Sequence, residues 1–156
     1  MATNLHNVHR NFIYRIEAIS PTNTMPGKNF LAFDPNRLQG DEASGMTRAF
    51  FVHWKGSDPQ TVTADGSDRT TTHRYELTFF YSTHYAHDVL HDIIAQDRHD
   101  LVKNLQDQSK IVGYDSGNTT TDVGIYERFF ISDEMEMGDD VYTYRQQWTL
   151  TINEVS

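Results

Sequence analysis

The sequence contains no cysteine, and this absence excludes disulfide bonds and thiolate metal sites. It has no apolar run near the ~18 residues that a membrane-spanning helix requires. Residues 1–12 lack the basic and apolar regions of a secretory signal peptide. We therefore expect a soluble protein made in a cytoplasm, whose 156 residues form a single domain, 1–156, that needs no covalent cross-link.

Basic residues are scarce as well. Lys and Arg number 13 against 22 Asp and Glu, which gives a formal charge of −9. Proteins that grip nucleic acid through its phosphates carry a basic patch, and none is visible along this sequence. An acidic surface fits either ordinary solubility or a passage along which DNA slides without sticking.

The spacing of apolar residues predicts two helices. Leu5, Val8 and Phe12 begin a stripe with steps of three and four, which predicts a helix over 4–19, and a second stripe predicts one over 84–107. Alternating β-branched and aromatic residues predict four strands, at 47–54, 72–82, 122–132 and 141–153. The expected fold is α+β, a mainly antiparallel sheet with two helices packed on one face, in the order α-β-β-α-β-β. A further short strand is suggested near residues 30–33.

The last two predicted strands are the most informative part of the sequence. Segments 122–132 and 141–153 are each longer than the usual ~5–6 residues of a strand. The acidic segment 133–140 between them is predicted to be a loop. The sequence ends on this hairpin, so we expect an outer edge that no later element covers. Such an edge needs a neighbour or a block, which makes assembly the first functional hypothesis.

Three histidines are the sharpest candidates for metal chemistry. His84, His87 and His91 fall on one side of the predicted helix, and His87 and His91 have the i, i+4 spacing of zinc-binding helices. Asp88 stands where the HExxH pattern has its catalytic Glu. The histidines form either a polar flank of the helix or a metal site with a third ligand such as His84 or His53.

Other chemical motifs are absent from the sequence. The acidic segment 133–140 does not have the spacing of an EF-hand, and there is neither a Gly-x-x-x-x-Gly-Lys-Ser/Thr loop nor a Gly-x-Ser-x-Gly elbow. The aromatic strands could stack on bases, but few Lys and Arg lie among them. We therefore expect no enzyme activity and no cofactor.

Three stretches resemble the tail terminator, or tail-completion, proteins of long-tailed bacteriophages. They are the strand TRAFFVHWKG, the strand-to-helix step HRYELTFFYSTHYAHDVLHDIIAQDRHDLVKNL and the closing hairpin that ends WTLTINEV, together roughly half the chain. The resemblance implies a structural virion protein that forms a homo-oligomeric, generally hexameric, ring on the head-proximal end of the tail tube. The segment 20–46 departs from this likeness.

The resemblance also implies the partners and the location. The ring would stop polymerisation of the tail tube protein and bind a neck or head-completion protein at the tail–neck junction, after assembly in the host cytoplasm. DNA would pass through its lumen without specific binding, and no membrane is involved. Four alternatives stay open: a head–tail connector or stopper, a tail tube subunit, a small His-metal enzyme, and a small-ligand binding domain with its pocket between helix and sheet.

The contact residues that we expect lie in two predicted loops, 55–71 and the acidic hairpin loop. Their role would be electrostatic matching between rings, where rim pairs contribute at most ~1 kcal/mol each. The candidates are Asp65, Asp68 and Arg69 in the first loop, and Glu134, Glu136, Asp139 and Asp140 in the second.

Overall fold

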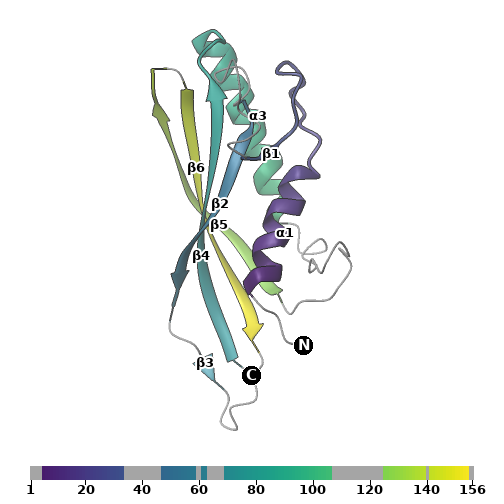
Figure 1. Cartoon of the computed structure of the whole chain (residues 1–156), viewed down its shortest axis with the longest axis vertical. Helices are drawn as coiled ribbons and strands as arrows, with labels where there is room; N and C mark the ends of the chain where they lie inside the picture. Colours follow the sequence, from purple (N-terminus) through teal and green to yellow (C-terminus); the bar gives the residue numbers. More distant parts are fainter. Residues whose placement is uncertain are drawn as a thin grey trace.

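The computed structural model describes residues 5–33, 47–58, 61–62, 69–106, 125–139 and 141–154. Figure 1 shows long strands that twist about one another, with the helices lying beside them. In chain order the elements are α1 (Leu5–Glu17), β1 (Leu31–Ala32), β2 (Ala49–Ser57), β3 (Thr61–Val62), β4 (Arg69–Ser82), α3 (His87–Gln106), β5 (Ile125–Met137) and β6 (Val141–Glu154).

The six strands that the structure describes belong to one sheet. The path across it is β1-β2-β4-β6-β5, and β3 pairs with β4 away from this path. The β1–β2 pair is parallel and the other pairs are antiparallel, so the sheet is mixed. The α+β class is confirmed, but the predicted order lacked β3 and included β1 only as a further short strand suggested near residues 30–33. These strands have two residues each, too few for alternation to mark them.

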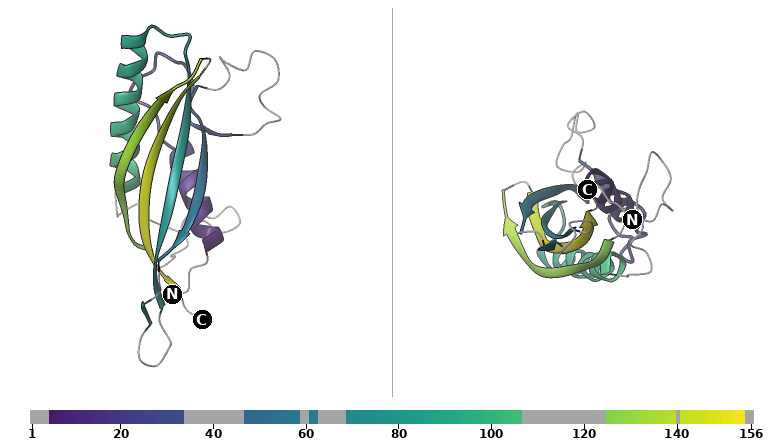
Figure 2. Two further views of the ribbon diagram at one scale, coloured as in Figure 1. Left: turned by 90° about the vertical axis from the view of Figure 1, so that its left-hand side faces the viewer. Right: turned by 90° about the horizontal axis from the view of Figure 1, so that it is seen from below.

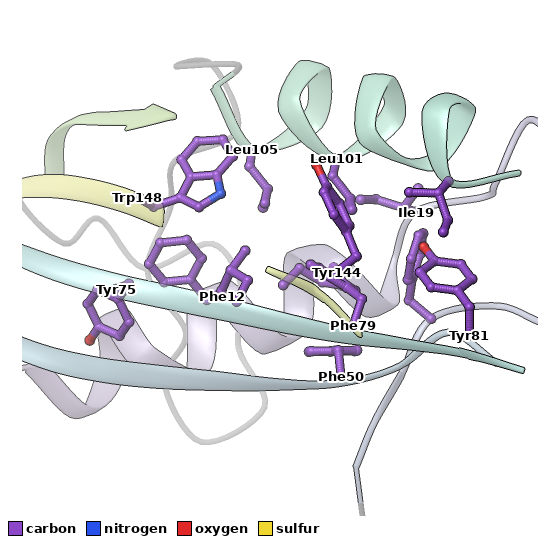
Figure 3. Packing of buried hydrophobic residues seen from close by; sticks show 14 of the residues in the cluster. Phe12, Ile19, Phe50, Tyr75, Phe79, Tyr81, Leu101, Leu105, Tyr144 and Trp148 are labelled. Carbon is purple, nitrogen blue, oxygen red and sulfur yellow. The ribbon is translucent and has the colours of Figure 1, made fainter. Parts of the chain in front are cut away.

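The alternation in β4 and β6 decides which face of the sheet is covered. In β4, Tyr75, Leu77 and Phe79 are buried, whereas Arg74, which precedes them and points to the other face, is exposed. In β6, every second residue from Tyr142 to Ile152 is buried in the same way. Both helices contribute to the one hydrophobic cluster that covers this face, as Figure 3 shows for Phe12 of α1 and Leu101 of α3. The expectation of two helices on one face is therefore correct.

The other face of the sheet carries no helix in the described part of the chain, as the left view of Figure 2 makes visible. Its residues in β4 and β6 are mainly polar, and many are threonines, whereas Phe51 of β2 and Phe129 of β5 are exposed apolar residues on it. A half-polar face of this kind is common in antiparallel sheets, which can leave one side to water. We call it the open face.

A buried ion pair holds α3 against the sheet. Arg48, which precedes β2, donates from Nε and Nη2 to the two carboxylate oxygens of Asp97 in α3, at 2.8 and 2.7 Å. Both side chains are almost fully buried. The Tyr81 hydroxyl donates a third bond to Asp97, at 2.7 Å. Burial raises the pKa of Asp97, while the bonds from Arg48 and Tyr81 act in the opposite direction.

The same guanidinium also fixes the segment between α1 and β1. Arg48 Nη1 donates to the carbonyl of Lys28 at 2.7 Å, and Nη2 donates to the carbonyl of Asn23 at 2.8 Å. Arg48 adopts a φ of 66°, a conformation that is uncommon for residues other than glycine. One side chain thus joins an irregular segment, the start of β2 and the middle of α3.

A second buried arginine lies at the C-terminal end of α3. Arg128 of β5 donates to the carbonyl of Leu105 at 2.7 Å and to the side chain of Asn11 at 2.8 Å, with its guanidinium 4.8 Å from the ring centroid of Phe12. Its Nη2 has no hydrogen-bond partner in the described structure. Burial lowers the pKa of Arg128 to about 9, and the charge of Arg15 acts in the same direction. This residue connects β5 with both helices.

The buried Arg48–Asp97 ion pair predicts that removing the negative charge of Asp97 strongly destabilises the fold. Asp97→Asn leaves the buried guanidinium without its counter-charge, so the free energy of unfolding should fall by about 3–5 kcal/mol. The control Asp92→Asn, at an exposed position of the same helix, should change it by less than about 0.5 kcal/mol. Denaturant unfolding followed by circular dichroism measures both, and equal effects would contradict the role of the pair.

Replacing tyrosine by phenylalanine should have opposite effects on the free energy of unfolding at Tyr75 and at Tyr81. Among the described residues the buried Tyr75 hydroxyl has no hydrogen-bond partner, so Tyr75→Phe should raise the free energy of unfolding by about 1–3 kcal/mol. Tyr81→Phe removes the bond to the Asp97 carboxylate and should lower it by about 1.5–3 kcal/mol. Thermal and denaturant unfolding of the two variants, side by side, tests the difference in sign. A loss of stability in Tyr75→Phe would show that the Tyr75 hydroxyl does have a hydrogen-bond partner.

Candidate interface on the terminal hairpin

The hairpin of β5 and β6 extends further than the sequence predicted. Strand β5 runs through to Met137, so the predicted acidic loop 133–140 is wrong over its first five residues. Methionine and glutamate alternate there, and in the strand this alternation puts Met135 and Met137 on one face and Glu134 and Glu136 on the other. The segment is therefore part of a stiff ladder, and only the turn that follows it is a loop.

The turn itself depends on a glycine. Gly138 donates its N–H to the carbonyl of Val141 at 3.0 Å, which closes the hairpin. A Cβ atom on Gly138 would lie 2.7 Å from that carbonyl oxygen, closer than real Cβ contacts allow. Asp139 is exposed in this turn, and its carbonyl accepts a bond from the Thr83 hydroxyl at 3.4 Å. The tip of the hairpin thus lies beside the segment that precedes α3.

Strand β5 forms one end of the sheet, and in the described part of the chain nothing pairs with its outer side. The ladder to β6 shifts between Phe130 and Ser132, which leaves Ile131 as the extra residue of a β-bulge. From Ser132 to Met137 the ladder is regular. Strand β6, where the sequence ends, is internal instead, so the open edge belongs to β5 and not to the last strand.

Large apolar side chains are exposed along this edge. Phe129, Ile131, Met135 and Met137 are 47%, 57%, 40% and 66% exposed. A protein can leave single apolar residues on its surface, but a row of them on an unpaired strand indicates an interaction site or an aggregation hazard. We call Phe129–Met137 the β5 edge.

The carboxylates of the β5 edge have partners within the chain. Arg145 of β6 lies on the open face, with Nη1 2.9 Å from Glu136 and 4.0 Å from Glu134. Both glutamates are about two-thirds exposed, so these are weak, solvent-screened pairs. On the helix side, Asp133 accepts bonds from Arg98 at 2.6 Å and from the Tyr144 hydroxyl at 2.7 Å.

An open hollow of about 350 Å³ lies between α3 and the β5 edge, around Arg98 and Asp133. Three of the polar groups that line it already bind one another, since Asp133 accepts from both Arg98 and Tyr144. Apolar Ile94, Ala95 and Met135 form much of the remaining lining. The hollow therefore offers a contact surface more readily than a specific small-molecule site.

The predicted contact residues that the structure describes do not form one cluster. Glu134 and Glu136 lie on strand β5, not in a loop, and Asp139 lies in the turn. Arg69 is the first residue of β4, where its backbone pairs with Val62 and Glu154. The expected loop 55–71 is therefore partly strand, because β2 continues to Ser57 and β4 begins at Arg69. Three of the candidates, Asp65, Asp68 and Asp140, lie outside the described residues.

The histidines come together only as a pair. His87 and His91 of α3 have ring centroids 4.2 Å apart, and His87 Nδ1 lies 3.0 Å from the hydroxyl of Tyr142. His84 precedes the helix, and His53 lies on the open face of β2 next to Glu76, on the side away from α3. Among the described residues, no group of three His, Asp or Glu side chains is arranged to hold a metal ion.

Sequence reasoning missed the buried charges that position this hairpin. A signal for Asp97 was available, because it falls between Ile94 and Leu101 on the apolar stripe of α3, where a carboxylate needs a buried partner. Nothing in the sequence showed that this partner would be Arg48. The pairing of Arg145 with the acidic residues was hidden too, because the sequence predicts a loop over 133–140 and not a strand.

Comparison of the sequence with protein-family models and with curated proteins finds no match. Of the helices that the structure describes, none combines the length and the apolar character needed to cross a membrane.

The turn geometry predicts the cost of a methyl group at its glycine. Gly138→Ala forces the Val141 carbonyl away and weakens the closing hydrogen bond, so the free energy of unfolding should fall by about 1–3 kcal/mol. Asp139→Ala, at the exposed neighbour, should change it by less than about 0.5 kcal/mol. Denaturant unfolding and amide hydrogen exchange at the hairpin tip measure both. Equal stability of the two variants would show that the turn opens without cost.

Proposed function

We propose that this protein is a structural component of a phage tail, a tail-terminator-like protein that forms a ring on the head-proximal end of the tail tube. The ring stops tube polymerisation and joins the tail to the neck. The observation that carries this proposal is the β5 edge, whose outer side is unpaired among the described residues and which exposes Phe129, Ile131 and Met137.

A ring suits such an edge because rotational symmetry offers every copy the same neighbour. The isolated chain presents unpaired peptide groups and apolar side chains to water, and a cyclic assembly covers them on each subunit. The resemblance of the strand, helix and hairpin segments to tail-completion proteins supports the particular ring, a hexamer that binds a tube protein on one side and a neck protein on the other.

The charge of the protein supports the passage of DNA through the ring. With a formal charge of −9, the subunits repel the phosphate backbone, so DNA can slide through a lumen without being held. The polar groups described at the hairpin bind one another and leave no prepared set of donors for a small substrate. The proposal includes a purely structural role, without catalysis or cofactor.

Purified protein mixed with tail tubes of the same phage tests the proposal. We expect one ring at one end of each tube in electron micrographs, a discrete multimer by native mass spectrometry, and an end to tube growth once the protein is added. Long tubes formed by the protein alone would instead identify a tube subunit. A monomer that never binds tubes would contradict the proposal.

The hairpin tip gives a variant for the docking step. Asp139→Lys combined with Asp140→Lys should weaken binding of the ring to its partner ring, because it reverses the charge at the tip. The control, Asp88→Lys with Asp92→Lys, makes the same change of charge on exposed positions of α3. Co-sedimentation with tail tubes and with the neck protein, at two salt concentrations, compares the two. Normal docking of the tip variant would exclude a role for the tip in docking.

A further inference from the structure

The sheet has a second open edge, on β2. Among the described residues, strand β1 pairs with β2 only at Ala49 and Phe50. Phe33 donates to the carbonyl of Phe50 at 2.7 Å, so the peptide groups of Phe50 face away from β4. The alternation of a β-strand then turns the peptide groups of Val52 and Trp54 outward as well. In the described part of the chain no strand pairs with them. We call Phe51–Ser57 the β2 edge.

The two edges run in opposite directions. Three antiparallel ladders, β2–β4, β4–β6 and β6–β5, separate β2 from β5. When copies of the sheet follow one another around an axis along the strands, β5 of one copy therefore meets β2 of the next in antiparallel orientation. This arrangement continues the sheet with the pairing type that is more frequent in proteins.

Exposed apolar side chains of the two edges lie at the same height along the strands. One row of paired residues crosses the sheet from Trp54 through Tyr75 and Trp148 to Phe130. At one end of this row Trp54 is 44% exposed, and at the other end the bulge residue Ile131 is 57% exposed. Apolar groups would thus meet near the centre of a joint between two copies, where they contribute most to binding.

The charges of the two edges are complementary. The β5 edge, Phe129–Met137, contains three carboxylates and no cation, whereas the β2 edge, Phe51–Ser57, contains Lys55 and His53 and no carboxylate. Like edges would bring acidic residues against acidic residues, so a β5–β5 joint between two copies is disfavoured. Opposite charges favour the unlike pair, β5 with β2.

We propose that the β5 edge of one copy pairs with the β2 edge of the next, so that the sheets of neighbouring copies join edge to edge. The proposal rests on the proposed ring and names the surface that builds it. Two different edges make a head-to-tail contact, and such contacts close into rings when the rotation between copies permits. The occupant of each edge is thus a second copy of this chain.

Cysteine cross-linking tests the pairing directly, because the natural sequence contains no cysteine. His53 and Ser132 lie on one row of the open face, at opposite ends, and both are exposed. A chain with His53→Cys and Ser132→Cys should form a ladder of covalent multimers under mild oxidation, and each single variant should stay monomeric on a denaturing gel. A mixture of the two single variants should give dimers only.

A second pair of cysteines tests a different register between the two edge strands. Strands that close into a ring are staggered, and a shift of two residues keeps the same face. His53→Cys is therefore also tested with Glu134→Cys. Met25→Cys combined with Ser132→Cys is the control, because Met25 is 61% exposed in the segment between the α1 helix and β1, away from both edges. This control should give no ladder.

A charge placed in the joint provides an independent readout. Ile131→Lys should abolish the multimer in native mass spectrometry at concentrations where the natural protein is assembled, with an unchanged circular dichroism spectrum. Met25→Lys should leave the multimer intact. Normal assembly of Ile131→Lys, or dimers of Ser132→Cys alone, would overturn the pairing of β5 with β2.

The two proposals fail in different ways. Rings that cap tail tubes but give no ladder with either cysteine pair would overturn the edge pairing and leave the proposed function standing. Cross-linked rings that never bind a tail tube would support the edge pairing and contradict the terminator role. A protein that stays monomeric both alone and with tail tubes would overturn both.

Discussion

The ion pair between Arg48 and Asp97 is the constraint on which the rest of the structure depends. Moving two charges out of water costs several kcal/mol each, and only close contact with satisfied hydrogen bonds offsets that cost. Here the guanidinium of Arg48 donates to both carboxylate oxygens of Asp97 and to two backbone carbonyls. The Tyr81 hydroxyl donates a further hydrogen bond to the same carboxylate. Because neither group can be displaced without leaving its partner uncompensated, the segment before β1, the start of β2 and the middle of α3 hold one arrangement.

That arrangement decides which surfaces remain available. With α3 held against β4 and β6, and Arg128 joining β5 to both helices, the helices cover a single face of the sheet. In the described structure no element of the chain covers the open face or the two edges, so these surfaces are available to water or to a partner. The edges differ in charge and share exposed apolar residues, as seen at Lys55 and Trp54 on one side and at Glu134 and Ile131 on the other. A surface of this kind fits the proposed assembly with copies of this chain.

The acidic residues of the hairpin take a different physical role from the one expected of a mobile loop. Glu134 and Glu136 are held on a strand beside Arg145, and Asp133 is bound by Arg98 and Tyr144. Their charges give the β5 edge its sign, but they are partly neutralised and fixed in place. A rigid charged edge selects its partner through orientation, since a copy presenting the same edge would meet like charges.

The sequence by itself determined the α+β class, both helices and the long terminal hairpin, because hydrophobic periodicity reports directly which residues face the core. It could not reveal that Glu134 and Glu136 belong to β5, since their partner Arg145 lies across a turn and only register brings the three together. It also could not place β6 inside the sheet, or join Arg48 to Asp97 over 49 residues of sequence. Pairing between distant segments depends on the packing of the whole chain, and so only the tertiary structure decided which edges are open and which charges are buried.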